Sequence, residues 1–233
     1  MYTTEWQACS SELFDITARP KTIDTLVQKL QRERKLTLDE VQDLAGVRID
    51  ADITLSVQTA LAEEIAGHFG ERSRVRDLRE NPHSGYRAVH VWLRLPAGRV
   101  EVQIRTVGQS AWANTYERIG DLLGRGIRYD EMPEDEDARR LIEQMHMVSE
   151  KLASNERARD ALAVLQTQLE EVRKSIEATP QERKQSAEYL ESVARLDDIA
   201  ERAGKMMAER DAYYAEVVSI LADVRRMLDR DRS

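Results

Sequence analysis

Apolar residues recur with a helical period in two segments of the first half of the chain. In residues 22–34 they fall at i, i+3, i+4 and i+7, which predicts an amphipathic helix with Thr22 as its N-cap. Residues 55–69 form a second predicted helix, which ends near Gly70. Between the two helices, residues 47–49 are a short apolar run that is typical of a buried strand.

A period of two marks residues 86–95 and 100–106, which we interpret as the strands of a β-hairpin with one apolar face. A turn in the middle of the connecting loop makes the numbers of opposed residues sum to 195. This register pairs Glu101 with Arg94, Trp92 with Gln103, and His90 with Arg105. The polar face then gathers a candidate site on a rigid sheet, made of Tyr86, His90, Glu101, Gln103 and Arg105.

Heptad-like spacing of apolar residues dominates the chain after about residue 134. We predict two long helices, residues 134–178 and 181–229, which Pro180 separates and which pack as an antiparallel hairpin. Apolar residues thin out around 153–160, so we expect a break in the first helix there. The hairpin is either a scaffold that joins copies of the chain into a homo-oligomer or a clamp that inhibits the first half.

These elements predict an α/β (α+β) fold, with a mixed sheet flanked by helices over residues 1–128 and a helical region over 129–233. Of the 233 residues, 41% are hydrophobic and only 5% are aromatic, so the core must be mostly aliphatic. The single cysteine, Cys9, excludes a disulfide framework and a cysteine zinc site. Because no apolar run is long enough for a membrane span and no signal peptide is visible, we expect a cytoplasmic protein.

The net charge of −8 is unevenly distributed along the chain. Residues 1–128 hold equal numbers of basic and acidic side chains, so the whole acidic excess lies in residues 129–233. Two local basic clusters, within residues 19–35 and 72–79, stand out in the neutral half. Basic surfaces of this kind bind phosphates, although a solvated helix face explains any single cluster equally well.

Four segments, in their order and spacing, resemble the RelA/SpoT nucleotidyltransferase family, which includes the small alarmone synthetases. They are RPKTIDTLVQKL at 19–30, QDLAGVRI at 42–49, HSGYRAVH at 83–90 and EVQIRT at 101–106. The resemblance covers roughly residues 13–128. It implies a pyrophosphokinase that moves the β,γ-pyrophosphate of ATP onto a 3′-hydroxyl, on GDP or GTP in alarmone synthetases and on the tRNA 3′ end in a toxic subgroup.

The residue types fit a reaction of polyanions, which needs fixed cations around the donor phosphates. By resemblance, Arg19, Lys21 and Lys29 hold the ATP triphosphate. Arg48 is expected to assist them. Each of these residues taken alone would more often be a solvated charge, and the shared spacing is what favours an ATP site.

Two acidic residues, Asp43 and Glu101, match the family's Mg2+ ligands. Glu101 is also expected to take the proton of the attacking hydroxyl. The alternatives are structural: an ion pair between Glu101 and Arg94 across the hairpin, and a helix-cap or surface role for Asp43.

The acceptor site is implied by the same resemblance. Tyr86 matches a tyrosine that stacks on the acceptor base, and His90 would contact the acceptor's phosphate or ribose. Gln103 and Arg105 either position Glu101 and bound phosphate or serve the sheet structurally.

The loop before Tyr86 departs from the pattern of alarmone-producing members. It reads NPHSGY at 81–86 and lacks their lysine and asparagine, of which the lysine helps to hold the pyrophosphate of GDP. The tRNA 3′ end is therefore slightly favoured as acceptor, as in toxins and phage-defence proteins that stop growth and that an antitoxin neutralises. Arginines within residues 72–79 offer a track for a nucleic-acid backbone. Synthesis of guanosine tetra- or pentaphosphate, and an inactive or autoinhibited oligomer, are the alternatives.

Overall fold

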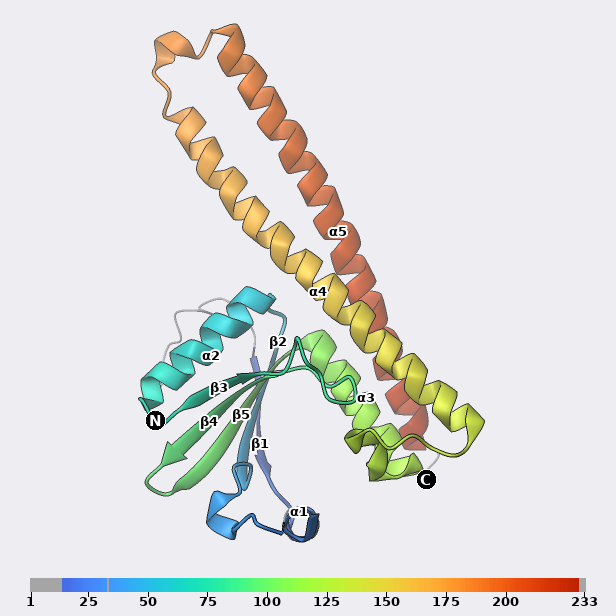
Figure 1. Cartoon of the computed structure of the whole chain (residues 1–233). Helices are drawn as coiled ribbons and strands as arrows, with labels where there is room; N and C mark the ends of the chain where they lie inside the picture. The colour runs from blue at the N-terminus through green and yellow to red at the C-terminus, as the bar shows by residue number, and fades with distance from the viewer. Residues whose placement is uncertain (1–13, 33, 231–233) are drawn as a thin grey trace.

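A five-stranded mixed sheet carries the first half of the molecule, and two long helices follow it (Figure 1). The computed structural model describes residues 14–32 and 34–230, without the side chains at positions 19, 20, 39 and 182. The elements are β1 Phe14–Pro20, α1 Ile23–Arg32, η2 Leu38–Glu40, β2 Ala45–Ala51, α2 Leu55–Phe69, β3 Arg74–Asp77, β4 Val89–Leu95, β5 Gly98–Thr106, α3 Val107–Leu123, η3 Arg125–Tyr129, α4 Glu136–Glu177, η4 Gln181–Arg183 and α5 Ala187–Arg230.

The strand order β1-β2-β5-β4-β3 contains one parallel pair, β2 with β5, and three antiparallel pairs. Alternation along the strands gives the sheet an apolar face, which packs against Leu61, Ala62 and Ile65 of α2. The opposite face carries polar side chains, among them Glu101 and Gln103 of β5. The predicted mixed sheet with flanking helices is therefore confirmed. Its polar face is available for a binding site.

The predicted hairpin register is wrong by two residues. Leu95 pairs with Gly98, so the turn lies at Pro96 and Ala97, and Gly98 adopts the positive φ of 142° that favours glycine. A shift of two residues keeps every side chain on its predicted face but changes its partner. Glu101 consequently lies opposite Trp92, and Arg94 lies opposite Arg99. The alternative ion pair between Glu101 and Arg94 is thereby excluded as a directly opposed pair.

A second core joins the sheet half to the helical hairpin. Trp112 and Tyr116 of α3 are buried against Ile142 of α4 and against Tyr214 and Leu221 of α5. Figure 1 shows the remainder of α4 and α5 projecting well beyond the sheet as an antiparallel pair. The near ends of the two helices thus complete the core that α3 begins.

The break expected near residues 153–160 is absent, since α4 runs unbroken from Glu136 to Glu177. Two polar residues of this stretch, Asn155 and Glu156, are buried between the helices. Glu156 accepts hydrogen bonds from Thr106 and Gln109, and Tyr214 of α5 donates to it at 3.3 Å. Partnered polar groups therefore replace apolar packing at this level of the helix pair.

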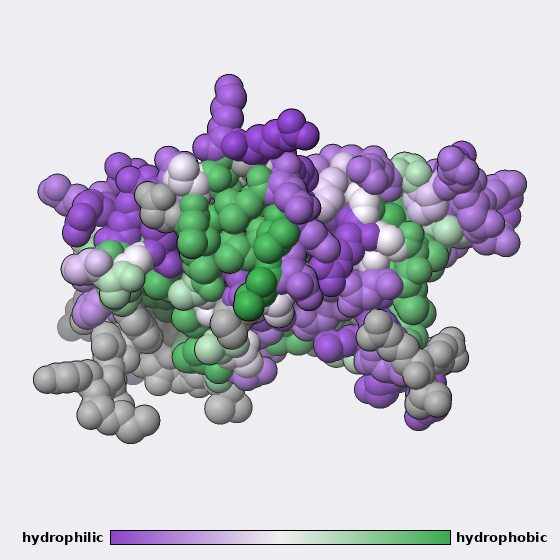
Figure 2. Space-filling model, turned by 90° about the horizontal axis from the view of Figure 1, so that it is seen from below, coloured by the Kyte–Doolittle hydropathy of each residue, from purple (hydrophilic) through white to green (hydrophobic). Residues whose placement is uncertain are grey.

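The end of the molecule that holds α1 and η2 is partly apolar. Seen from below in Figure 2, hydrophobic side chains gather there between hydrophilic areas. Helix α1 has no buried residue, and Ile23, Val27 and Leu38 are exposed. Across the described residues, no helix has an apolar stretch that would let it cross a lipid bilayer.

Candidate active site

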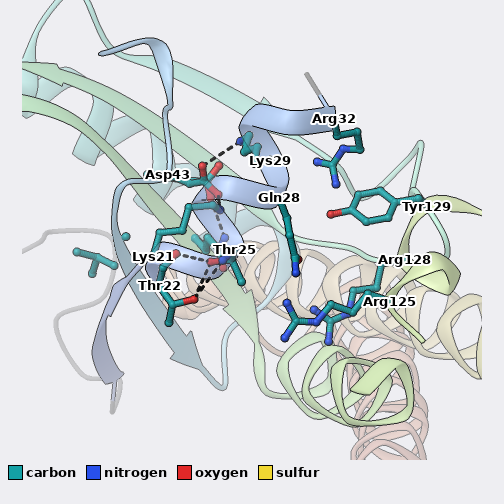
Figure 3. A pocket seen from close by; sticks show the side chains of 14 residues that line it. Lys21, Thr22, Thr25, Gln28, Lys29, Arg32, Asp43, Arg125, Arg128 and Tyr129 are labelled. Carbon is teal, nitrogen blue, oxygen red and sulfur yellow. Dashed lines mark hydrogen bonds and ion pairs between the residues drawn. The ribbon is translucent and has the colours of Figure 1, made fainter. Parts of the chain in front are cut away.

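A cavity of about 360 Å³ opens on the polar face of the sheet, between α1 and η3 (Figure 3). This volume is in the usual range for small-ligand sites. Its wall is mostly polar and consists of Lys21, Thr22, Thr25, Gln28, Lys29, Arg32, Asp43, Gly46, Val47, Glu101, Gln103, Arg125, Arg128 and Tyr129. Asp43 and Glu101 are thus brought to one cavity although 58 positions separate them in the sequence.

The α1 side of the cavity is built on Asp43. Lys29 Nζ donates to Asp43 Oδ1 at 2.9 Å, and Lys21 forms an ion pair with Oδ2. Lys21 is fixed between β1 and α1, where its backbone N–H bonds Leu44 O at 3.2 Å. Burial works to raise the pKa of Asp43, but the hydrogen bonds and charges of the two lysines outweigh it and hold that pKa below its usual value. Asp43 is therefore ionised at neutral pH.

On the floor of the cavity, both carboxylate oxygens of Glu101 have donors. Trp92 Nε1 lies 3.0 Å from Oε1, and Gln103 Nε2 lies 2.8 Å from Oε2. His90 Nδ1 lies 3.2 Å from Oε1. Burial opposes ionisation, yet His90 and these hydrogen bonds lower the pKa of Glu101 to about 2. The pKa of His90 rises to about 9 against its own burial, because Tyr86 and Glu101 favour the charged ring. The pair is a carboxylate and an imidazolium at neutral pH.

A closed ring of hydrogen bonds continues behind Glu101. Arg105 Nη2 donates to Gln103 Oε1 at 3.1 Å and to the Tyr86 hydroxyl at 2.9 Å. That hydroxyl lies 3.0 Å from His90 Nε2, which returns the chain to Glu101. Because all five side chains are tied to one another, Glu101 is held in one orientation before any ligand binds.

The ten sequence-predicted residues fall into four groups. Five line the cavity: Lys21, Lys29, Asp43, Glu101 and Gln103. Three lie behind it in the hydrogen-bonded ring: Tyr86, His90 and Arg105. Arg48 lies apart from the cavity wall, where it donates to Asn114 Oδ1 at 3.1 Å. The side chain of Arg19 lies outside the described residues, although its backbone pairs with Gly46 of the cavity wall.

The wall opposite α1 was missed by the sequence analysis. It comes from η3, which contributes Arg125, Arg128 and Tyr129. Arg32 of α1 lies over the Tyr129 ring at 4.2 Å and joins the two walls. The only signal in the sequence is the short run of glycines and arginines at 124–128, which has no period and belongs to none of the four resembling segments.

The charges of the cavity favour an anionic ligand. Five basic and two acidic side chains line it, on a chain whose net charge is −8. Among the described residues no cluster of three or more metal-ligating side chains occurs. Two ionised carboxylates nevertheless fit Mg2+, which is usually held by one or two carboxylates together with substrate phosphates. The site is thus suited to Mg2+ that arrives with a polyphosphate.

The arginines of residues 72–79 do not form one free basic surface. Arg79 is bound to Asp77 and donates to Leu55 O at 2.8 Å, which fixes it against α2. Arg74 donates to the carbonyl groups of Glu71 and Ser73. Arg76 lies opposite His90 in register, and its guanidinium is 4.5 Å from the Trp92 ring.

Residues 18–120 match the family described as the region found in RelA / SpoT proteins. Uncharacterized proteins of Mycobacterium tuberculosis (Rv1366) and Mycobacterium bovis (Mb1401) are each 62% identical over 130 residues, 55% of this chain. These residues are 46% of each relative, so the chain spans about half the length of the curated relatives it matches.

Two solved structures from Bacillus subtilis are similar, each with 23% sequence identity. Small alarmone synthetase 2 has a TM-score of 0.47, and the match covers 61% of this chain and 76% of that one. Small alarmone synthetase 1 has a TM-score of 0.45, and the match covers 70% of this chain and 80% of that one.

Proposed function

We propose that the chain is an ATP- and Mg2+-dependent pyrophosphokinase, because residues 18–120 match the region found in RelA / SpoT proteins. The bond between the α-phosphate oxygen and the β-phosphorus of ATP breaks and AMP leaves. A 3′-oxygen of the acceptor bonds to that phosphorus, and its proton passes to the solvent. The observation that carries the proposal is the meeting of Asp43 and Glu101 with Lys21 and Lys29 in one cationic cavity.

The donor polyphosphate is proposed to bind Lys21 and Lys29. Both lysines form ion pairs with Asp43. A triphosphate offers them a stronger partner, so its binding releases the Asp43 carboxylate for a metal ion. Arg19 is proposed as a further phosphate ligand because its backbone pairs with Gly46 at the cavity. Arg48 could bind a phosphate only after breaking its hydrogen bond to Asn114.

Mg2+ is proposed to bind Asp43 and Glu101, where it would neutralise the charge that develops on the transferred phosphates. A carboxylate with a pKa of about 2 is a weak base at neutral pH. Glu101 is therefore better suited to holding the ion and orienting the attacking hydroxyl than to storing its proton. Gln103, which donates to Glu101, positions it.

The acceptor is proposed to lie beside Tyr86 and His90. The Tyr86 ring is held by its hydroxyl, as a stacking platform requires, and stacking contributes about 1–3 kcal/mol per base. The imidazolium of His90 places positive charge next to Glu101 for an acceptor phosphate or ribose. Arg105 is buried and is proposed as a positioning residue, since it ties Gln103 to Tyr86.

Between the two acceptor classes, we favour the tRNA 3′ end slightly, and with it a growth-inhibiting role of the toxin or phage-defence kind. The loop at 81–86 lacks a lysine for a guanosine diphosphate. All four residues of β3, next to His90, are exposed, so this edge of the sheet leaves room for a long acceptor. The alternative acceptor is GDP or GTP.

Incubation with ATP labelled at the β- and γ-phosphates tests the proposal, with GDP, GTP or tRNA as acceptor and AMP release measured in parallel. We expect AMP and label on the tRNA 3′ end. Label on guanine nucleotides alone would replace the tRNA version by the alarmone version. Absence of both AMP and labelled product in every arm would refute the pyrophosphokinase and leave an inactive interaction protein.

A further inference from the structure

The η3 wall of the cavity carries two guanidinium groups and little negative charge. Arg125 Nε and Arg128 Nη2 lie 3.6 Å and 3.4 Å from the same oxygen, Oδ1 of Asp121. One carboxylate thus serves two cations. Figure 3 shows both guanidinium groups directed toward the space below Gln28, across from Lys21 and Lys29. The wall is cationic and faces the proposed polyphosphate site.

Arg128 is fixed before any ligand binds. Its Nη2 donates to Glu117 O at 2.6 Å. Its side chain crosses α3 at Gly120, where a Cβ atom would come 3.0 Å from Nε. The turn that presents it is closed by a backbone hydrogen bond from Glu131 N–H to Gly126 O at 3.2 Å. A guanidinium held in this way loses little freedom on binding an anion.

We infer that Arg125 and Arg128 bind the polyphosphate of the donor nucleotide from the wall opposite Lys21 and Lys29. The inference rests on the proposed function and adds a second set of phosphate ligands to it. Arginine binds phosphate through paired, charge-assisted hydrogen bonds, so the two walls together select a nucleoside triphosphate over a monophosphate.

The test is calorimetric binding of the α,β-methylene analogue of ATP with Mg2+, and of AMP, to the full chain. We expect Arg125→Ala and Arg128→Ala each to weaken binding of the analogue about tenfold or more, and binding of AMP by less than about threefold. Arg128→Lys should bind the analogue with an intermediate affinity, since lysine keeps the positive charge but lacks the paired N–H donors of the guanidinium. Arg140→Ala, at an exposed ion pair on α4, is the matched control and should change neither affinity.

The outcomes separate the two claims. Wild-type affinity for the analogue in both alanine variants overturns this inference and leaves the pyrophosphokinase standing. Equal losses of affinity for AMP and for the analogue also overturn it, because the arginines would then not distinguish a triphosphate from a monophosphate. No binding of the analogue to the unmodified chain refutes the donor site itself, and the proposed function falls with it.

A different observation concerns the outer side of α5. Five apolar side chains are exposed there at intervals of seven residues. They form the α5 stripe: Ile199 (45% exposed), Met206 (51%), Tyr213 (38%), Ile220 (53%) and Met227 (65%). One exposed apolar residue is ordinary, but a line of five on a helix is what a second helix covers.

Charges beside the α5 stripe indicate which helix covers it. Four residues before each stripe member the chain carries Arg195 and Arg202, then Glu209, Glu216 and Asp223. In an antiparallel helix pair this flank meets its own copy, so that Arg195 faces Asp223 and Arg202 faces Glu216. Only Glu209, at the centre, meets a like charge. The geometry points to a second copy of this chain, packed antiparallel along the α5 stripe.

Analytical ultracentrifugation of the full chain over a concentration series tests this surface. We expect a dimer that Ile220→Glu dissociates and that Glu209→Gln tightens, because the like-charge contact is removed. Val172→Glu, at an exposed apolar position on α4, is the matched control and should leave the dimer intact. A monomer at every concentration, or a dimer that only Val172→Glu weakens, would overturn the α5 stripe as the interface.

Discussion

At the scale of single residues, the electrostatics of Glu101 set what this side chain can do. Three donors surround its carboxylate, and a histidine that is charged at neutral pH is one of them. Desolvation alone would make such a group protonated and inert toward a metal. The donors reverse that effect, so the buried acid keeps its charge and faces the cavity.

Glu101→Gln is expected to lower pyrophosphate transfer by at least about a hundredfold, because the neutral amide cannot stabilise a metal ion. The change keeps the size of the side chain but removes the charge that pairs with His90, so the variant should fold with a lower urea midpoint than wild type. The measurement is AMP release together with urea unfolding. The matched control is Glu143→Gln on the exposed side of α4, which should transfer at the wild-type rate. Equal activity of the two variants would contradict a role for Glu101.

The His90–Glu101 pair predicts a pH window for stability. The folded-state pKa of His90 is raised from 6.5 to about 9, so its contribution is complete below pH 6.5 and is lost as the pH rises through 9. Glu101, with its pKa lowered from 4.5 to about 2, contributes above pH 4.5. The free energy of unfolding of wild type relative to His90→Gln should therefore fall by on the order of 2 kcal/mol between pH 6 and 10. If the difference in unfolding free energy between the two proteins stays constant over that range, the pair is ruled out.

At the scale of elements, a buried junction helps to hold the hairpin to the sheet. The backbone N–H of Gly108, at the start of α3, donates to the Tyr214 hydroxyl at 2.6 Å. That hydroxyl donates in turn to the buried Glu156 at 3.3 Å. Strand β5, which carries Glu101, ends at Thr106, and Thr106 also bonds Glu156. The junction thus connects both long helices to the strand of the candidate site.

A pair of glycine variants tests this junction. A Cβ on Gly108 would lie 2.7 Å from the Tyr214 ring, so Gly108→Ala should force the ring away and cost about 1–3 kcal/mol of unfolding free energy. Gly204, in the exposed middle of α5, has open space around it. Gly204→Ala should instead stabilise by about 0.5–1 kcal/mol, since alanine favours the helix. Thermal unfolding of the two variants should shift in opposite directions.

At the scale of the whole molecule, the long hairpin has two different parts. Its near part shares a core with α3, and its far part stands clear of the sheet (Figure 1). Among the described residues that line the cavity, none comes from α4 or α5. The sequence pattern changes near residue 128, but the packing is continuous there, because α3 packs against both the sheet and the hairpin.

Two deletions distinguish support from inhibition by the hairpin. Removal of residues 134–233 exposes Trp112 and Tyr116, so the product should be insoluble or unfolded by circular dichroism. Replacement of residues 164–206 by a short flexible linker keeps the shared core and should leave a folded, active protein. Transfer that rises severalfold after the second deletion would show that the far part of the hairpin inhibits; unchanged or lower transfer would show that it does not.

The sequence by itself determined the elements whose periods are strong. The period of two in residues 86–106 fixed which side chains share a face, and the heptads after residue 134 fixed two long helices. Local spacing also found five of the cavity residues through the family resemblance. These features depend on neighbours along the chain, which is what a period records.

Only the tertiary structure decided which partners those side chains meet. The turn at Pro96 and Ala97 shifts the hairpin register by two residues from the predicted one. As a result Glu101 interacts with Trp92 and His90 and does not lie opposite Arg94. The residues of η3 show no hydrophobic period, and they line the cavity because α3, which follows β5, ends beside it. Helix α4 stays unbroken near Glu156 because its polar partners come from α3 and α5. In each case the deciding contact joins segments far apart in the chain, and no local pattern records such a contact.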